Sequence, residues 1–411
     1  MSYTRLIAGV LAGGLLATAC GTAAAPDPEP TGDPASLRLV ADLDPADATA
    51  VGTSVNQFGF DLLAQVGDGT QNTVTSPVSA AALLAMVLAG AGGQTAEEMA
   101  AVLHLDDSRD VRVGALLREL ADTDDVTLSV ANALWAREGY PFEDNYLAFA
   151  RDAFGATVDD ADLASQETAD EIDAWVRDQT EDRIDGIAAD LGLPNGDAVL
   201  VLLNAVYFLG TWTTQFDPAD TRDGGFRLTD GTTATVPFMH LTHQPLPVAQ
   251  RDGYQMLRLT YGEDERYAME ILLPDDGVDL PRLLSSLDAA EWAAAVGALQ
   301  VREVSELALP RFELEWKADL NDPLRALGMD SAFGGGDFTP MSPENPFLDV
   351  VVQKTYLRVD EAGTEAAAVT GGVMRESAGE TFRVDRPFAF TISDSQTGTI
   401  LFLGAVADPR G

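Results

Sequence analysis

Apolar residues repeat at helical intervals through the early part of the chain. Phe58, Leu62, Leu63 and Val66 recur three or four positions apart, so they fall on one face of a helix. The run Ala80–Gly90, which follows the letters "TSPVS", has the same apolar character. We therefore predict two packed helices in this part of the chain.

Two further helix starts are predicted from capping boxes, in which a Thr and a Glu three residues later satisfy each other's backbone amides. Thr95 with Glu98 forms one such pair, and Thr168 with Glu171 forms another. Residues 280–296 are also predicted to be helical. These patterns predict local structure and carry no chemistry.

The pattern changes to that of strands from the middle of the chain onward. The run Ala198–Trp212, "AVLVLLNAVYFLGTW", is nearly all apolar and rich in Val and Leu, which suits a strand buried on both faces. Further strand-like stretches are residues 267–274, 305–316, 347–360, 386–393 and 399–409. Early helices followed by many strands indicate an α+β fold with large sheets.

The N-terminus carries the pattern of an export signal. Arg5 precedes the apolar run Leu6–Leu16, and small residues follow up to Cys20. This order is typical of a signal peptide over residues 1–20, because the apolar run is too short to span a bilayer. We therefore expect an extracellular or cell-surface protein.

Cys20 is the only cysteine, so the chain cannot form an internal disulfide. The stretch "LATAC" resembles the lipobox of bacterial lipoproteins, in which the cysteine is lipidated. Leu16 lies one position further from Cys20 than that motif places its leucine. Two hypotheses stay open, a lipid anchor at Cys20 or simple secretion, and we expect membrane contact only through such an anchor.

Composition divides the rest of the chain into a tether and a domain. Residues 21–50 are rich in Pro, Asp and Ala, which predicts a flexible tether, and residues 51–411 are expected to form the folded domain.

The net charge of the chain limits its partners. The chain has 25 basic and 66 acidic residues, a net charge of -41. Such a charge repels phosphate backbones, so we expect no nucleic-acid partner.

Enzyme signatures are absent from the sequence. It contains no G-x-S-x-G, H-E-x-x-H, Walker or dinucleotide-binding motif. The three histidines are His104, His240 and His243, and prolines around the last two indicate strand and loop. No cysteine lies near them to complete a site. We therefore expect no metal, no cofactor and no enzymatic activity.

One stretch fits neither a loop nor a strand. "DEAGTEAAAVT", from Asp360 to Thr370, has small residues where a strand would have bulky ones and a loop would have Pro or Asn. Together with "TSPVSAAALLAMVLAGAGGQT", "ANALWA", "LVLLNAVYFLGTW" and "DRPFAF" followed by "GTILFLGAVADP", it resembles the serpin family over roughly Val51–Pro409. The resemblance implies three β-sheets, about eight to nine helices and an exposed reactive-centre loop.

The resemblance also implies roles for single residues. Ser76, Pro77 and Ser79 match the shutter region beneath the main sheet, and Asn204 matches the shutter asparagine. Trp212 matches the breach tryptophan, at the top of the sheet where loop insertion starts. These positions would let the strands of the main sheet part.

Two other places in the sequence relate to the same family pattern. Pro387 and Phe388 match the element that follows the reactive-centre loop. Gln353 stands where many animal serpins have a shutter histidine. The hydrogen bonding and pH behaviour of that histidine are therefore not transferred to this chain.

The family resemblance implies a monomeric protease inhibitor that is consumed by its target. A serine protease would attack the loop, and the cleaved loop would then insert into the main sheet with the protease still attached. A cysteine protease is the alternative target. A non-inhibitory binding or surface-recognition protein with the same fold is the alternative function.

The hinge of that loop would be the first part to insert, and its residues are small. Thr364, Ala366, Ala368 and Thr370 would point beneath the sheet, Glu365 would point to solvent, and Gly363 would be the pivot. No proline occurs from Ala362 to Ala378 to interrupt a ladder, which favours inhibition. The expected hinge comprises Glu361, Gly363, Thr364, Glu365, Ala366, Ala367, Ala368, Val369 and Thr370.

The reactive bond is predicted a few residues further on. Counting from the hinge by family spacing gives Ser377, whereas counting back from Pro387 gives Glu376. Glu376 fits the loop length best and suggests a glutamate-preferring protease. Arg375, which would suit a trypsin-like protease, and Met374 stay as alternatives.

Overall fold

The computed structural model describes residues 43–106, 109–121, 126–364 and 380–411, except for the side chains of residues 129–131 and 204–206. All described elements belong to the unit Leu39–Gly411. The helices within these residues are α1 Pro45–Val66, α2 Pro77–Leu88, α3 Gly93–Leu103, α4 Val111–Ala121, α5 Asp144–Phe154, α6 Gln166–Gln179, α7 Leu280–Ser286, α8 Ala289–Gly297 and α9 Asn321–Leu327.

The described strands form three hydrogen-bonded sheets. A nine-stranded sheet has the order β1-β15-β14-β8-β7-β6-β9-β13 with β5 paired to β6, a four-stranded sheet has the order β12-β4-β2-β3, and β10 pairs with β11. The strands are β1 Thr73–Thr75, β2 Val126–Arg137, β3 Thr157–Ala161, β4 Leu200–Thr211, β5 Arg222–Arg227, β6 Thr233–Arg251, β7 Tyr254–Tyr261, β8 Tyr267–Pro274, β9 Gln300–Pro310, β10 Phe312–Asp319, β11 Val352–Val359, β12 Gly363–Thr364, β13 Glu380–Arg383, β14 Phe388–Asp394 and β15 Ile400–Val406. The predicted α+β fold is confirmed.

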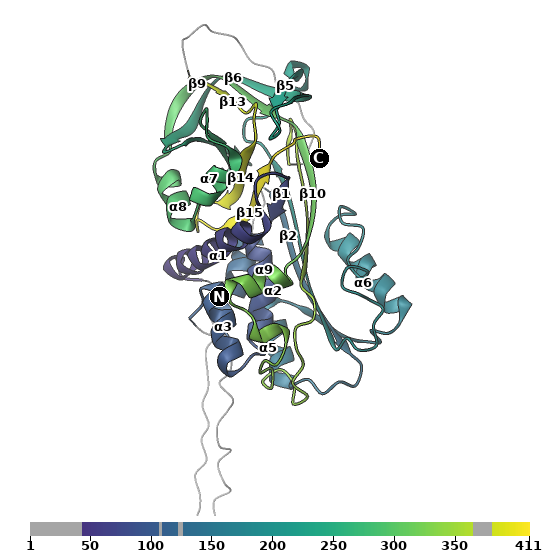
Figure 1. Ribbon diagram of the computed structural model, residues 1–411. Helices are drawn as coiled ribbons and strands as arrows, with labels where there is room; N and C mark the ends of the chain where they lie inside the picture. Colours follow the sequence, from purple (N-terminus) through teal and green to yellow (C-terminus); the bar gives the residue numbers. More distant parts are fainter. Residues whose placement is uncertain (1–42, 107–108, 122–125, 365–379) are drawn as a thin grey trace, which may run out of the picture. The chain divides into compact units, whose positions relative to one another are not determined.

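Helices cover both faces of the four-stranded sheet. Figure 1 shows α6 on the opposite side of the long strands from α1 and α2. α6 packs on β2 and β4 through a buried apolar cluster that includes Trp135, Ile172 and Leu203. The long apolar run predicted as a strand buried on both faces therefore becomes β4, between α2 and α6.

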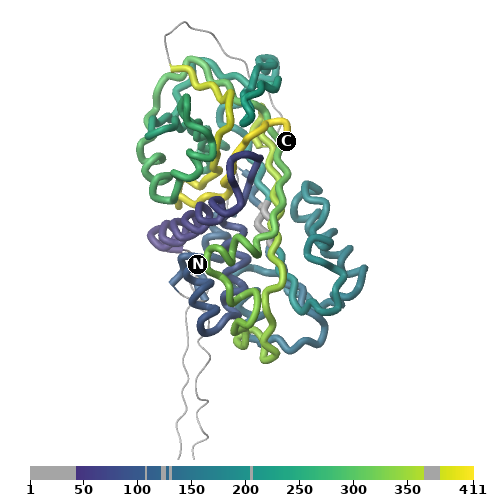
Figure 2. The backbone as a smooth tube through the Cα atoms, viewed as in Figure 1, coloured from purple at the N-terminus to yellow at the C-terminus, as the bar shows by residue number. Residues whose placement is uncertain are grey.

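The first helix packs beside the last two strands of the described domain. Figure 2 shows the purple helix α1 next to the yellow C-terminal strands. The Asn56 side chain donates to the Gly398 carbonyl at 2.7 Å and accepts from the Ile400 amide at 2.8 Å. The buried Asn56 amide thus satisfies the backbone of a segment that is remote in the sequence.

The first helix begins earlier than the sequence predicted. Asp44 caps α1 by accepting from the Ala46 amide at 2.9 Å, and Pro45 occupies the first turn, where its missing N–H costs nothing. Ala48 in this turn and Val51 in the next are buried. The stretch of the predicted tether from Pro45 to Ala50 is therefore helical.

Both predicted capping boxes are wrong, although both helices exist. α3 begins after Gly92, and Thr95 instead accepts from the Asp337 amide while Glu98 accepts from the Ser331 amide, each at 2.9 Å. α6 begins after Ser165, whose hydroxyl accepts from the Glu167 amide. Thr95 and Glu98 thus hydrogen-bond residues that are distant in the sequence, whereas Thr168 lies inside α6.

Three other stretches differ from the elements predicted from the sequence. Residues 280–296 form two helices, because Asp288 breaks the run and caps α8. Residues 305–316 divide at Arg311 into the end of β9 and the start of β10. His240 and His243 both lie within the continuous strand β6, which the prolines do not interrupt.

Candidate functional site

The strand pairing is interrupted between β4 and β11. β11 pairs with β10, and β4 pairs with β2, but no ladder among the described residues joins β11 to β4. The chain leaves β11 at Val359, turns, and returns as the short strand β12. β12 pairs antiparallel with β4, on the edge of β4 that has no other partner in the described part of the chain. The predicted hinge therefore begins a new strand beside the gap between β4 and β11, and we call these separated strands the parted sheet.

Two hinge residues already occupy this position. Gly363 pairs with Thr211 and Thr364 pairs with Gly210. Gly363 has φ +150°, and a Cβ atom there would lie 2.0 Å from the Gly210 carbonyl oxygen. The Thr364 side chain is 3% exposed. Only glycine lets the backbone approach β4 this closely, and this approach brings Thr364 under the sheet.

Thr364 has a specific partner below the sheet. Its Oγ1 atom lies 3.1 Å from the hydroxyl oxygen of Tyr261, at the end of β7. The ring of Tyr261 stacks on Trp212 with a centroid distance of 4.3 Å and an interplanar angle of 15°. Burial raises the pKa of Tyr261 strongly, so the hydroxyl stays protonated and available for this hydrogen bond.

Trp212 holds the turn that leads into the hinge. Its indole N–H donates to the Asp360 carbonyl at 2.9 Å, and its backbone N–H donates to the Ala362 carbonyl at 2.9 Å. The side chain is 2% exposed. Trp212, which the family resemblance assigns to the breach, is therefore in direct contact with the turn that leads into the predicted hinge.

Glu361 is anchored by its side chain as well as its backbone. Arg311 donates to both carboxylate oxygens at 2.7 Å, and the Thr221 hydroxyl donates to Oε1. Burial alone would raise the pKa of Glu361, but these hydrogen bonds outweigh it and hold the pKa below its ordinary value. The carboxylate is charged at neutral pH and ties the hinge to the start of β10.

The predicted shutter residues lie at the start of α2. Ser76 precedes the helix, Pro77 occupies its first turn, and Ser79 is buried. The Ser76 hydroxyl is buried and has no hydrogen-bond partner among the described residues. Asn204 lies in β4 opposite Asn132, and its side chain is outside the described set.

Gln353 links this region to β11. Its side-chain oxygen accepts from the Thr75 hydroxyl at 2.6 Å and the Ser76 amide at 3.3 Å, and its side-chain nitrogen donates to the Ser76 carbonyl at 3.0 Å. An amide does not titrate between pH 5 and 8. The link between α2 and β11 is therefore independent of pH in that range.

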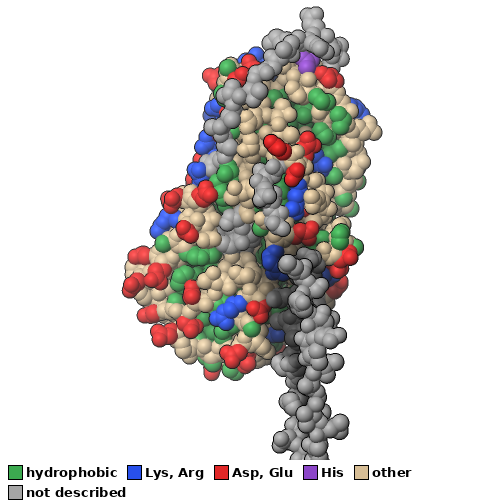
Figure 3. Space-filling model, turned by 180° about the vertical axis from the view of Figure 1, so that it is seen from behind, with side chains coloured by type: hydrophobic (Ala, Val, Ile, Leu, Met, Phe, Trp, Pro, Cys, Tyr) green, Lys and Arg blue, Asp and Glu red, His purple; other side chains and the backbone are tan. Residues whose placement is uncertain are grey.

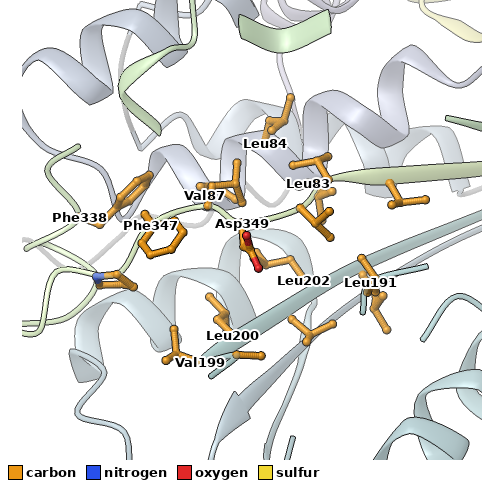
Figure 4. Close-up of a pocket in the computed structure, with 18 of the residues that line it drawn as sticks. Leu83, Leu84, Val87, Leu191, Val199, Leu200, Leu202, Phe338, Phe347 and Asp349 are labelled. Atoms are coloured by element: carbon orange, nitrogen blue, oxygen red, sulfur yellow. The ribbon is translucent and has the colours of Figure 1, made fainter. Parts of the chain in front are cut away.

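A cavity extends along the parted sheet below β12. It has a volume of about 370 Å³ and lies between α2, β4 and the segment that leads into β11. Figure 4 shows Leu83, Leu84 and Val87 facing Leu200 and Leu202 across it. Apolar side chains placed in this cavity would be buried against its lining.

The remaining predicted residues are distributed as follows. Phe388 begins β14 and packs against Phe312 at a ring distance of 5.8 Å, and Pro387 precedes it. Outside the described residues lie Cys20, Glu365, Ala366, Ala367, Ala368, Val369, Thr370, Met374, Arg375, Glu376 and Ser377. The sequence did not identify Tyr261, Thr221 or Arg311, because each contacts the hinge from a distant part of the chain.

The histidines form no metal site among the residues that the structure describes. His104 contacts Asp61 at 2.8 Å at the end of α3. His240 contacts Glu306 at 3.1 Å, and its pKa is lowered mainly because it is buried. Over the same residues, no helix is long and apolar enough to cross a membrane.

Comparison with known proteins gives consistent matches. A family model described as "Serpin (serine protease inhibitor)" matches residues 53–409. An uncharacterized serpin-like protein of Thermococcus kodakarensis is 36% identical over 371 residues, which cover 87% of this chain and 85% of that protein. The leukocyte elastase inhibitor of Sus scrofa is 34% identical over 377 residues, which cover 86% and 98%.

Solved structures are similar over the same region. The native-state crystal structure of tengpin, a thermophilic serpin, matches with a TM-score of 0.80 and 25% identity. The match covers 89% of this chain and 95% of that one. The arrangement of sheets and helices is therefore shared with a serpin in its native state.

Proposed function

The chain belongs to the serpin family, and from this premise we propose that it inhibits a protease by inserting its own cleaved loop into the parted sheet. The protease attacks the loop and becomes covalently attached as an acyl-enzyme. The loop then enters between β4 and β11 as a new strand. The attached protease is carried with it and is trapped before the ester is hydrolysed.

One observation carries this proposal. β12 is the first piece of a strand that the sheet can extend, because Gly363 and Thr364 are paired to β4 beside the gap in the ladder. The apolar cavity lies in the path that the following residues would take. The hinge and the gap are thus aligned for strand addition.

The length of an inserted strand and the free energy of its hydrogen bonds are both large enough to trap a protease. A strand of about 14 residues with a rise of about 3.3 Å per residue extends nearly 50 Å, which carries a bound protease across a domain of this size. Ladder hydrogen bonds of about 0.5–1.5 kcal/mol each give a total on the order of 10 kcal/mol. This free energy is available to distort the active site of the protease.

Replacing Thr364 with Arg tests the mechanism. A buried guanidinium beneath the sheet is strongly unfavourable, so we expect the loop of Thr364→Arg to be cleaved and the protease to be released. The wild-type chain should form a complex that survives SDS electrophoresis. Thr233→Arg, at an exposed position, is the matched control and should inhibit like the wild type.

Two results would contradict the proposal. Inhibition by Thr364→Arg equal to that of the wild type would rule out insertion at β12. Cleavage of the wild-type loop with no complex and no rise in melting temperature would favour the alternative function, a non-inhibitory binding or surface-recognition protein.

We propose Glu376 as the residue before the reactive bond. The measurement is mass spectrometry of the products after incubation with glutamate-preferring, trypsin-like and cysteine proteases. Cleavage after Glu376 with complex formation supports this assignment. Cleavage after Met374, Arg375 or Ser377 would replace it, and a complex with the cysteine protease alone would change the target class.

We also propose that the chain is exported and anchored through a lipid on Cys20. The pattern of Arg5, the run Leu6–Leu16 and Cys20 supports this proposal. Cys20→Ser should move the protein from the membrane fraction to the medium. If the variant stays in the membrane fraction, the anchor lies elsewhere, and a wild-type protein that is already in the medium would favour simple secretion.

A further inference from the structure

The cavity along the parted sheet has features of a site for a small ligand. Its volume of about 370 Å³ lies within the usual range for ligand pockets, about 300–1,000 Å³. Apolar side chains from α2 and β4 form two of its walls, and Phe338 and Met341 also line it. Such a cavity suits a compact apolar or aromatic body.

The charged groups of this cavity all have the same sign. Among the described residues that line it, the charged ones are Asp197, Glu344 and Asp349, and none is basic. Figure 4 shows the Asp349 carboxylate between Val87 and Leu202, directed into the space between the two walls. An apolar pocket with only carboxylates favours a ligand that carries a positive charge.

The Asp349 carboxylate is available to such a ligand. It is exposed and makes no hydrogen bond or ion pair with any residue that the structure describes, whereas the Asn321 side chain donates to the Asp349 backbone carbonyl. Two residues earlier, the Phe347 side chain is 60% exposed at the edge of the cavity. An exposed carboxylate and an exposed aromatic ring thus flank an apolar space.

We propose that this cavity binds a small molecule with an apolar or aromatic body and a protonated amine. The body lies among Leu83, Val87 and Leu202, and the ammonium group donates to the Asp349 carboxylate. The hydrogen bond is charge-assisted and lies at the exposed rim of the cavity, where Asp349 is open to solvent, while the apolar body is buried between the walls. Neutral or anionic molecules of the same shape lack this interaction.

Binding at this place has a consequence that rests on the proposed function. The ligand occupies space between β4 and the segment that leads into β11, which is where the inserting strand must pass. A bound ligand therefore slows insertion, so that more loop is cleaved without trapping the protease. The cavity is then a regulatory site for the inhibitor.

The binding test uses the uncleaved full-length chain without protease. The probes are 2-naphthylmethylamine, 2-naphthylmethanol and 2-naphthoate, which share a ring system and differ in charge, and the measurement is titration calorimetry. We expect the amine to bind with one-to-one stoichiometry, the alcohol to bind more weakly, and the carboxylate not to bind.

Substitutions locate the site. Asp349→Asn should weaken binding of the amine about tenfold and leave binding of the alcohol unchanged, because a hydrogen bond to a charged group is lost. Asp276→Asn makes the same charge change at an exposed position outside the cavity and should have no effect. Leu83→Trp fills the cavity and should weaken binding of both probes, with circular dichroism used to verify that the variant folds.

Several results would overturn the proposal. Equal affinity for all three probes, or equal loss in Asp349→Asn and Asp276→Asn, would exclude an ammonium site at Asp349. Binding of a peptide with the sequence of residues 365–379, with no binding of the amine, would assign the cavity to the inserting strand alone.

Inhibition assays separate this inference from the proposed function. With the amine present, the number of inhibitor molecules consumed per trapped protease should rise for the wild type and stay constant for Asp349→Asn. Binding of the amine without such a rise would refute the regulatory consequence. If the chain traps no protease at all, the proposed function fails, while the calorimetric result still decides whether the amine site exists.

Discussion

At the scale of single residues, the hinge is held by groups of three kinds. Gly363 allows close backbone approach, Tyr261 gives Thr364 a hydrogen bond beneath the sheet, and Arg311 neutralises the buried carboxylate of Glu361. Each contact exists before the loop is cut. Each residue therefore affects how firmly the hinge is docked in the uncleaved protein.

Tyr261→Phe tests the contact with Thr364. The ring and its stacking on Trp212 remain, whereas one hydrogen bond worth about 0.5–1.5 kcal/mol is lost. We expect amide hydrogen exchange over residues 360–364 to become about fivefold faster. Tyr254→Phe, which removes a hydroxyl bonded to Glu291, is the matched control and should leave hinge exchange unchanged. Equal effects of the two variants would contradict the assignment.

Glu361 makes the stability of the fold depend on pH. Its pKa is below the ordinary value of 4.5, because the bonds from Arg311 and Thr221 outweigh the effect of burial. The unfolded chain therefore binds the proton more tightly, so this contribution is complete above about pH 4.5 and is lost as the pH falls through the folded pKa.

The urea midpoint of Glu361→Gln should therefore lie below that of the wild type at pH 7, and this difference should shrink below pH 4.5. Glu315→Gln, at an exposed position on β10, controls for the change in net charge. A difference that stays constant down to pH 3 would show that the Glu361 carboxylate is not the titrating group.

At the scale of elements, the connection between α6 and β4 is tied to β10 and β11 by ion pairs. Asp190 in this connection accepts from Lys317 on β10 at 2.7 Å and pairs with Lys354 on β11 at 2.6 Å. Lys354 also donates to the Gly186 carbonyl. Hydrogen bonds from the two lysines lower the pKa of Asp190. The connection therefore restrains β10 and β11 together.

Asp190→Asn should loosen this restraint. The side chain keeps its shape and loses its charge, so we expect a loss of up to about 1 kcal/mol in stability and easier strand insertion. Fewer inhibitor molecules should then be consumed per trapped protease. Asp185→Asn, at an exposed position on the same connection, is the control. A rise in the number consumed would mean that Asp190 assists insertion.

The sequence predicted most elements because their apolar patterns are local. β4 and β15 follow directly from nearly continuous apolar runs, and β8 follows from an apolar run that contains one charged residue, Glu270. Helix starts were wrong where side chains have distant partners, as Thr95 and Glu98 do with residues 331–337. The contact of Tyr261 with the hinge and the cavity beside Asp349 depend on tertiary packing, so no short sequence motif predicts them.

At the scale of the whole molecule, the net charge of -41 controls encounters with partners. Figure 3 shows acidic side chains spread over the visible face, with basic side chains among them. A field of one sign accelerates association with molecules of opposite charge and slows association with molecules of like charge. Cationic proteases should therefore meet the loop faster than anionic ones.

Salt provides the test of this steering. The association rate constant with a cationic protease should fall about tenfold between 0.05 and 0.5 M NaCl, because salt screens the attraction. The rate with an anionic protease of the same specificity should rise. Stopped-flow measurements with a fluorescent substrate follow both. Equal salt dependence for the two proteases would exclude steering by the net charge.

The two residues of β12 are a nucleus that folding has already formed. The first pairs of an added strand are the least favourable, because they restrict the chain before later pairs compensate for the lost entropy. Here Gly363 and Thr364 are paired to β4 before any bond is cut. In the proposed mechanism, capture of the protease would therefore depend on propagation from this existing end. Its rate would be set by the width of the gap beyond β12, and a search for the first contact would contribute little.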